Sequence, residues 1–367
     1  MTNGERHAGW LELFYDLMFV AFVAQLAHPL AGSPSVGAAL TMLALFAPAW
    51  WLWVSSTLYT NLFGEGGPER RISVLGQMAV VLIMAGGAEE AAHGQPALFA
   101  GAYVAGRAGL LVVRWLLGGR QPQGGSNTAV LISMAFWTAS IPLHPPLTYL
   151  LWAAGLATEV GSTLYRRSLP ELEISHLVER FGLFVIIVLG EGVAQLVAAL
   201  AAVHSTAQAM ATAIPAFAVL AALWWVYFDF GSAVAASALR ARGDERFPLA
   251  RRLFVYGHFV PVAALVALGA GLGALVRAAP APRDGVLPLI CAALAAYFCN
   301  NSICAVAVVG RPAATQIRWL APTLLLLALL GLLGQNLTPA LQVTAALAAF
   351  TLPTAVDGLM ARKMPAP

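Results

Sequence analysis

Long apolar stretches recur from one end of the chain to the other, and short gaps containing polar residues, proline or glycine separate them. Most of these stretches are long enough to cross a bilayer core of about 30 Å as a helix. Their apolar residues run continuously instead of alternating, which favours helices over the strands of a barrel. The pattern predicts an all-α, polytopic membrane helix bundle of about twelve transmembrane helices. The predicted spans are residues 10–30, 36–62, 71–92, 96–117, 127–143, 146–165, 176–203, 209–239, 250–277, 286–309, 316–335 and 338–358.

Composition supports a membrane location. Of the 367 residues, 60% are hydrophobic and only 10% are charged, and the mean hydropathy is +0.78. A soluble domain carries roughly a quarter charged residues, so this chain cannot build a water-facing surface of the usual kind. The net charge of +3 comes from basic residues scattered over short loops, which excludes a nucleic-acid partner. Cys291, Cys299 and Cys304 share one apolar stretch without metal-ligand spacing, and we expect no zinc site and no cofactor.

The distribution of basic residues predicts the orientation. The N-terminal residues are polar and lead directly into an apolar stretch that contains Glu12 and Asp16, which indicates a first spanning helix rather than a cleaved signal. With twelve spans, sixteen of the twenty basic residues fall on the side of both termini, and only Arg277 and Arg283 fall on the other side. Lys and Arg are enriched in cytoplasmic loops, so we expect both termini in the cytoplasm.

An internal repeat is visible. Trp-Leu-Glu-Leu-Phe (10–14) resembles Leu-Val-Glu-Arg-Phe (177–181), the stretch 49–53 resembles 223–227, and the stretch 70–78 resembles 251–259. The three landmarks keep their order, and they predict two six-helix halves, residues 1–168 and 169–367. An even number of spans in each half makes the repeats parallel, as in some secondary transporters with a substrate site between the halves. Duplication also builds membrane proteins of other kinds.

The same landmarks carry a family resemblance. They include Trp10-Leu-Glu-Leu-Phe-Tyr-Asp-Leu-Met-Phe-Val20 with Gln25-Leu26, Trp50-Trp51 with Tyr59 and Asn61, residues 176–191, Trp224-Trp225-Val-Tyr-Phe-Asp229, and Tyr256-Gly257-His258. In these stretches the chain resembles the bacterial low temperature requirement A (LtrA) family. It departs from the family at 61–64, where Asn-Leu-Phe-Gly replaces an Asn-Arg-Phe-Asp-like exit from the second span. The resemblance implies a protein of the bacterial cytoplasmic membrane and a link to growth in the cold.

Charged residues inside the spans are the main functional indication. An ionisable group in the bilayer costs at least about 2.5–3.5 kcal/mol, so such groups face the bundle interior and pair. Glu12 and Asp16 are four residues apart and share one helix face, where their like charges repel. They therefore require a cation, a proton or an arginine. The pair is a candidate proton or ion site, or an interfacial pair neutralised by a basic partner, and it is a weak candidate for binding Mg²⁺.

The seventh span carries a polar stripe at helical spacing. It contains His176, Arg180, Glu191 and Gln195. Glu191 is expected near the middle of the membrane, between two glycines that allow another backbone or a ligand to approach. Burial favours its neutral form. Glu191 is thus a candidate protonation site of a proton-coupled carrier, or a structural carboxyl group bonded to a neighbouring helix.

The fourth span contains Arg107, which stays charged and needs an acidic partner or an anionic substrate. Its candidate partners are Glu12, Asp16, Glu159 and Glu191. The remaining candidate site residues are Glu179 beside Arg180 at the start of the seventh span, Asp229 among the aromatics of the eighth, and His258 in the ninth. His258 could relay protons or could simply pack in the bundle.

These features favour a secondary carrier of a small solute or ion, possibly proton-coupled, that contacts membrane lipid. Glu191 and the Glu12/Asp16 pair would be its protonation sites, and Arg107 an internal counter-charge or an anion ligand. The alternative is a membrane-embedded enzyme acting on a lipid or isoprenoid, with Mg²⁺ at Glu12 and Asp16. A third possibility is a membrane component that transports nothing.

Overall fold

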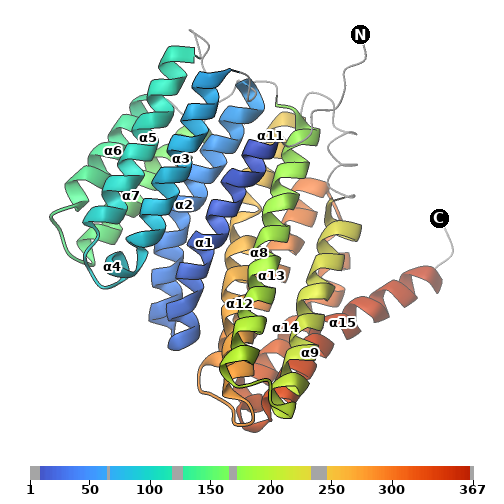
Figure 1. The fold of residues 1–367 in the computed structure, drawn as a ribbon. Coiled ribbons are helices and arrows are strands. Elements are labelled where there is room, and N and C mark those ends of the chain that lie inside the picture. The colour runs from blue at the N-terminus through green and yellow to red at the C-terminus, as the bar shows by residue number, and fades with distance from the viewer. Residues whose placement is uncertain (1–8, 64–66, 118–126, 165–171, 233–245, 364–367) are drawn as a thin grey trace. The chain divides into compact units, whose positions relative to one another are not determined.

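A computed structural model describes residues 9–63, 67–117, 127–164, 172–232 and 246–363 (Figure 1). Regular secondary structure within these residues is entirely helical. The longer helices are α1 (Trp10–Gly32), α2 (Val36–Phe63), α3 (Pro68–Gly86), α5 (Ala97–Leu117), α6 (Asn127–Ser140), α7 (Leu147–Leu164), α8 (Ile174–Ala202), α9 (Ala207–Trp225), α12 (Phe259–Ala278), α13 (Val286–Cys304), α14 (Ala313–Leu333) and α15 (Pro339–Lys363).

Short helical segments extend several of these helices. The short α-helices are α4 (Ala88–Ala92) and α11 (Arg246–Ala250). Three π-helical segments are η1 (Val226–Ser232), η3 (Arg251–Tyr256) and η4 (Ala305–Val309), and η5 (Gly334–Asn336) is a 3₁₀ turn. The predicted third span is shorter than expected, because α3 ends at Gly86 and Gly87 separates it from the short helix α4. Residues 233–239 of the predicted eighth span lie outside the described residues, as does the predicted boundary between the halves at 168–169.

The all-α membrane helix bundle is confirmed. Within the described residues, eight helices are long and apolar enough to cross a membrane. They cover Trp10–Gly32, Val36–Leu62, Ala97–Leu116, Ile174–Ala202, Ala207–Asp229, Pro248–Ala278, Val286–Val309 and Ala313–Asn336. The count of twelve crossings and the layout of two parallel repeats stay predictions.

The chain forms two compact units. Unit 1 comprises Met1–Leu26 and Leu40–Phe184, and unit 2 comprises Ala27–Ala39 and Val185–Pro367. Helices α1, α2 and α8 therefore each contribute residues to both units.

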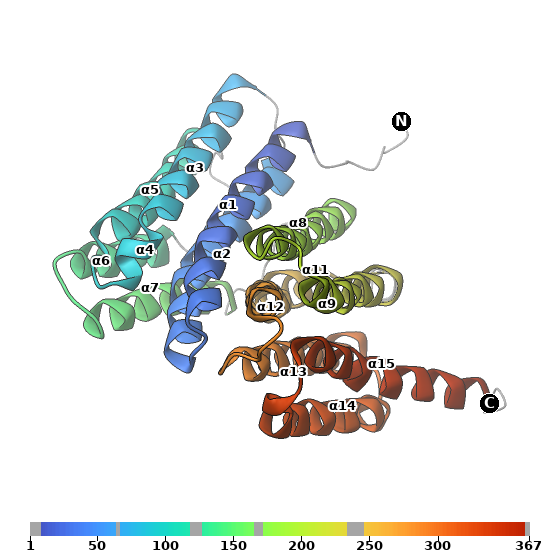
Figure 2. The ribbon, with the colours of Figure 1, turned by 60° about the horizontal axis from the view of Figure 1, so that its bottom comes forward.

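Aromatic side chains fill unit 1. Where α1, α2 and α8 meet, Trp53 lies with its ring centroid 4.9 Å from that of Phe181 and 4.4 Å from that of Phe184. Helix α3 packs on α5, α5 on α6, and α6 on α7, as Figures 1 and 2 show. Between α6 and α7, Trp137 stacks on Trp152 with centroids 4.6 Å apart. These large buried rings set the spacing of the helices that carry the polar residues described below.

Helix α12 is the centre of unit 2. It packs against α9, α13 and α15, and every residue from Pro261 to Val276 is buried. Figure 2 shows α12 flanked by α9, α13 and α8. A helix that is apolar all round suits such a position. Gly192 of α8 and Gly269 of α12 allow a close crossing, because a Cβ added at Gly269 would lie 3.0 Å from the Cα of Gly192.

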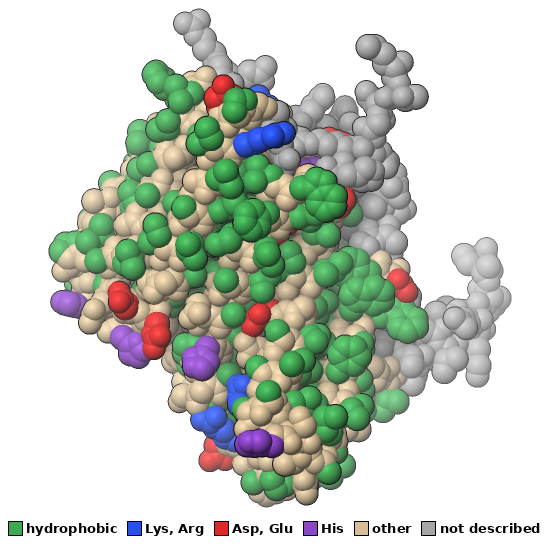
Figure 3. Space-filling view, in the orientation of Figure 1, with side chains coloured by type: hydrophobic (Ala, Val, Ile, Leu, Met, Phe, Trp, Pro, Cys, Tyr) green, Lys and Arg blue, Asp and Glu red, His purple; other side chains and the backbone are tan. Residues whose placement is uncertain are grey.

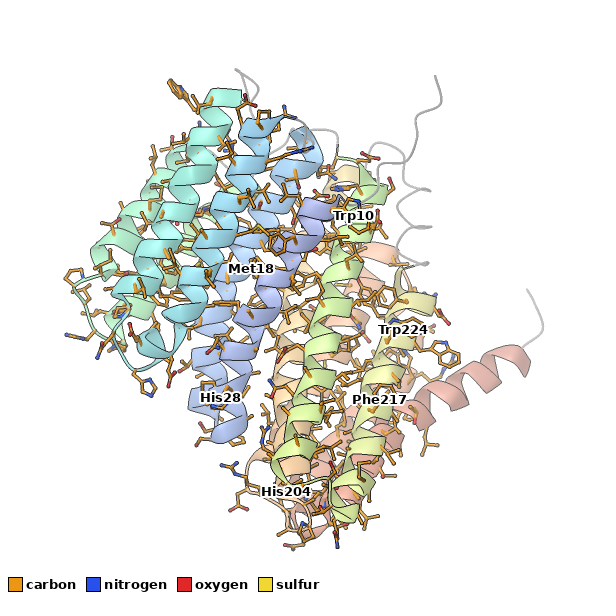
Figure 4. The ribbon with its side chains drawn as sticks, viewed as in Figure 1. Trp10, Met18, His28, His204, Phe217 and Trp224 are labelled. Carbon is orange, nitrogen blue, oxygen red and sulfur yellow. The ribbon has the colours of Figure 1, made fainter. Side chains whose placement is uncertain are left out.

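The exposed surface of the helices is apolar. Trp10 on α1 and Leu332 on α14 are 89% and 77% exposed. Hydrophobic side chains cover much of the face drawn in Figure 3, and Figure 4 shows Phe217 and Trp224 projecting from α9. Exposed large apolar side chains in such numbers are typical of helices that face lipid.

Candidate functional site

The first candidate site pairs α1 with α8 inside unit 1. The two carboxylate oxygens of Asp16 accept hydrogen bonds from Nη1 and Nη2 of Arg180, both at 2.8 Å. One turn earlier, Oε2 of Glu12 lies 2.9 Å from Nε2 of His176. All four side chains are 1% exposed or less. A two-pronged arginine–carboxylate contact fixes orientation as well as charge, so it anchors one helix against the other.

The pairing also gives the relative direction of the two helices. Glu12 to Asp16 and His176 to Arg180 are both steps of four residues, and both contacts join residues 164 positions apart. Phe19 and Phe184 continue the contact with ring centroids 5.8 Å apart. Helices α1 and α8 therefore run parallel through this part of unit 1. The repeated motifs at 10–14 and 177–181 begin these two contacting stretches.

Helix α2 supplies the partners that position this site. Nε1 of Trp53 donates to Oδ1 of Asp16 at 2.8 Å, and the guanidinium of Arg180 lies 5.8 Å from the centre of a Trp53 ring. Asn61 bonds to the peptide of Glu173 in both directions, donating to its carbonyl and accepting from its N–H, each at 3.0 Å. These two bonds fix the orientation of the Asn61 amide.

The Asn61 amide determines the proton position on His176. Its Nδ2 lies 3.0 Å from Nδ1 of His176, so the N–H donates and Nδ1 accepts. Nε2 of the imidazole then carries a hydrogen and donates to Glu12. Asp16 and Arg180 pair as opposite charges in an apolar interior.

A second buried ion pair joins α5 to α7 in unit 1. Nη2 of Arg107 donates to Oε2 of Glu159, which also accepts from Nε1 of Trp51 on α2 at 2.8 Å. Arg107 is 5% exposed and Glu159 is 2% exposed. Of the four acidic partners that the sequence allows, the structure places Glu159 beside Arg107.

The other predicted site residues lie elsewhere. Glu191 is buried in the unit 2 part of α8, and its Oε1 accepts from Nε2 of Gln195 at 2.7 Å. His258 donates from Nδ1 to the carbonyl of Leu253 at 2.8 Å, so its Nε2 accepts from the hydroxyl of Tyr227, also at 2.8 Å. Glu179 is half-buried near the start of α8, and Asp229 is exposed in η1.

The structure therefore brings Glu12, Asp16 and Arg180 together and places Arg107 in a separate pair. Sequence analysis missed the roles of Asn61, Trp51 and Trp53. Asn61 and Trp51 stand in the motifs that carry the family resemblance, which is the signal that could have identified them.

The residues that the structure describes offer no group of three or more His, Cys, Asp or Glu side chains that could hold a metal ion. Both oxygens of Asp16 accept from Arg180, so the carboxylate is directed at a cation of the protein itself. Cys291, Cys299 and Cys304 are free thiols.

Apolar helices that enclose paired charges define an integral membrane protein with several candidate spans and a polar interior. The family model for bacterial low temperature requirement A protein (LtrA) matches residues 7–353. The chain belongs to this family, and the resemblance found in its sequence is confirmed. An uncharacterized protein of Rhizobium meliloti (strain 1021) is 26% identical over 308 residues, which cover 74% of this chain and 73% of that protein. No solved structure matches.

Proposed function

We propose that this protein is a proton-coupled secondary carrier of a small solute or ion. The observation that carries the proposal is the buried group formed by Glu12, His176, Asp16 and Arg180. Ionisable side chains among membrane helices are costly and mark ion pathways or proton relays more often than they serve packing alone. The LtrA family membership supports a membrane role without naming a substrate.

The two pairs in this group have different tasks. Arg180 holds both oxygens of Asp16, and Trp53 adds a third hydrogen bond, so Asp16 anchors α1 to α8. Glu12 contacts the imidazole of His176 instead, at 2.9 Å. A carboxylate and an imidazole in hydrogen-bond contact are suited to pass a proton between them. The Glu12–His176 pair is therefore the proposed protonation site.

The other parts of the proposal come from the sequence. Glu191 would be a second protonation site, and Arg107, paired with Glu159, would be an internal counter-charge or an anion ligand. The predicted placement is the bacterial cytoplasmic membrane, with twelve spans, two parallel repeats and both termini in the cytoplasm. Lipid contacts the exposed apolar faces.

The proposal is tested in proteoliposomes that carry a pH-sensitive dye inside. A pH gradient is imposed, and amino acids, sugars, short carboxylates and inorganic ions are added one at a time. At least one solute should accelerate proton entry in parent vesicles, and Glu12→Gln should abolish that acceleration. The matched control is Glu90→Gln, because Glu90 is exposed on α4. Parent vesicles that behave like empty ones for every solute, or equal flux from Glu12→Gln and the parent, would reject the proposal.

A further inference from the structure

Unit 1 contains a second polar interior, between α5, α6 and α7. Nε and Nη1 of Arg107, Oγ of Ser133 and Nε1 of Trp137 are buried there without a hydrogen-bond partner among the described residues. Oε1 of Glu159 and the hydroxyl of Tyr103 are likewise without a partner among them. Arg107 is 5% exposed, and Ser133 and Trp137 are fully buried. Buried polar side chains are nearly always satisfied, so this concentration of donors is unusual.

The packing places these groups in adjacent helical turns. The ring centroid of Tyr103 lies 4.1 Å from that of Trp137, and Arg107 follows Tyr103 by one turn on α5. On α7, a Cβ added at Gly155 would lie 2.9 Å from Nε1 of Trp137 and 3.1 Å from Oγ of Ser133. Glu159 follows Gly155 by one turn. The donors of α6 and the ion pair of α5 and α7 therefore occupy neighbouring layers of one interior.

The chemistry of these groups selects the ligand. Nε and Nη1 of Arg107, Nε1 of Trp137 and two hydroxyls, of Ser133 and Tyr103, are left to donate, and one carboxylate oxygen of Glu159 is left to accept. A group that only accepts hydrogen bonds fits such a surplus of donors, and an ionised carboxylate has two such oxygens. Arginine is the usual side chain for binding a carboxylate, and charge-assisted hydrogen bonds are the stronger kind.

Charge balance requires that one proton enters the site together with the ligand. Arg107 and Glu159 are neutral as a pair, so an incoming carboxylate would leave one negative charge in the interior. If Oε1 of Glu159 takes a proton from a hydronium ion of the surrounding water, Glu159 becomes neutral and Nη2 of Arg107 is released to the carboxylate. One O–H bond of the hydronium ion breaks as the O–H bond on Oε1 forms, a water molecule is left, and the occupied site is again neutral. Trp51 can still donate to Oε2 of Glu159.

We infer that Arg107, Ser133 and Trp137 bind a small organic carboxylate together with one proton held by Glu159. This inference rests on the proposed carrier function, and it names the substrate class.

The test measures binding of acetate, propionate and benzoate to the detergent-purified full chain by calorimetry at pH 6, 7 and 8. At least one of them should bind about tenfold more tightly for each unit of falling pH, as uptake of one proton requires. Glu159→Gln mimics the protonated carboxyl, so it should keep the affinity seen at low pH and lose the pH dependence.

Removal of a single donor should weaken binding without removing a charge. Ser133→Ala and Trp137→Phe should each weaken binding by about three- to tenfold. Trp115→Phe, an exposed position on α5, is the matched control and should bind like the parent. Absence of carboxylate binding, affinity independent of pH in the parent, or full affinity in both donor variants would overturn the inference.

The experiment separates this inference from the carrier proposal. Gradient-driven uptake of another solute, without carboxylate binding, would leave the carrier standing and remove the carboxylate site. Carboxylate binding with the expected variant pattern, but no gradient-driven flux, would support the site and reject the carrier.

Discussion

The contact between Asp16 and Arg180 can be measured by a double-mutant cycle. Removal of one partner from a buried ion pair costs about 3–5 kcal/mol, because the other charge is left uncompensated. Asp16→Asn and Arg180→Met should each lower the free energy of unfolding by about this amount, since both side chains are 1% exposed or less. The combination Asp16→Asn/Arg180→Met removes both charges of the pair, so neither is left without its partner. The double variant should therefore lose less free energy of unfolding than the two single variants lose together, by about 2 kcal/mol or more.

The assay is equilibrium unfolding in detergent micelles, followed by circular dichroism for the parent, both single variants and the double variant. Glu90→Gln, at an exposed position on α4, is the control and should stay within about 0.5 kcal/mol of the parent. If the effects of the two single substitutions add to that of the double variant within about 0.5 kcal/mol, the direct pairing of α1 with α8 is refuted. The free-energy changes of two substitutions are additive when the two residues do not interact.

Two further variants test the neighbouring contacts by the same unfolding measurement. Asn61→Leu removes the amide that bonds to His176 and to the Glu173 peptide. It should lower the free energy of unfolding by about 1–3 kcal/mol, because its buried partners are left unsatisfied. An unchanged unfolding curve would contradict this. Gly269→Ala should lower the free energy of unfolding by about 1–3 kcal/mol, since the added Cβ would lie too close to the backbone of Gly192. Gly190→Ala meets no atom within 4 Å and should be neutral or stabilising, so equal effects of the two glycine variants would argue against the close crossing.

Hydropathy alone predicted the helices, because a chain in lipid must satisfy its backbone within each segment. It could not predict how helices end. The third span stops at Gly86, and α9 continues into a π-helical turn at Val226, both of which depend on neighbouring packing. Within the described residues, the helices α3, α6, α7 and α15 of four predicted spans fall short of the length or apolarity that defines the eight candidate crossings.

Helical spacing placed Glu12 and Asp16 on one face and predicted that they needed a cation, a proton or an arginine. It could not name Arg180, because that partner comes from a distant part of the chain. The same limit left Arg107 with four candidate partners until the structure placed Glu159 beside it. Asn61 escaped notice because a neutral amide in a span carries no charge signal. Its function depends on bonds to Glu173 and His176, more than a hundred residues away.

Cross-linking tests the central claim, that α1 and α8 run parallel and pair their charges inside the bundle. Cysteines replace Phe19 and Phe184, whose ring centroids are 5.8 Å apart, in a chain whose three native cysteines are changed to serine. The account predicts that a short thiol-reactive cross-linker joins the two cysteines within one chain in native membranes. It also predicts much weaker cross-linking when the second cysteine is placed at Ile186, an exposed position two residues further along α8. Absence of the 19–184 cross-link, or equal cross-linking at 186, would contradict the pairing.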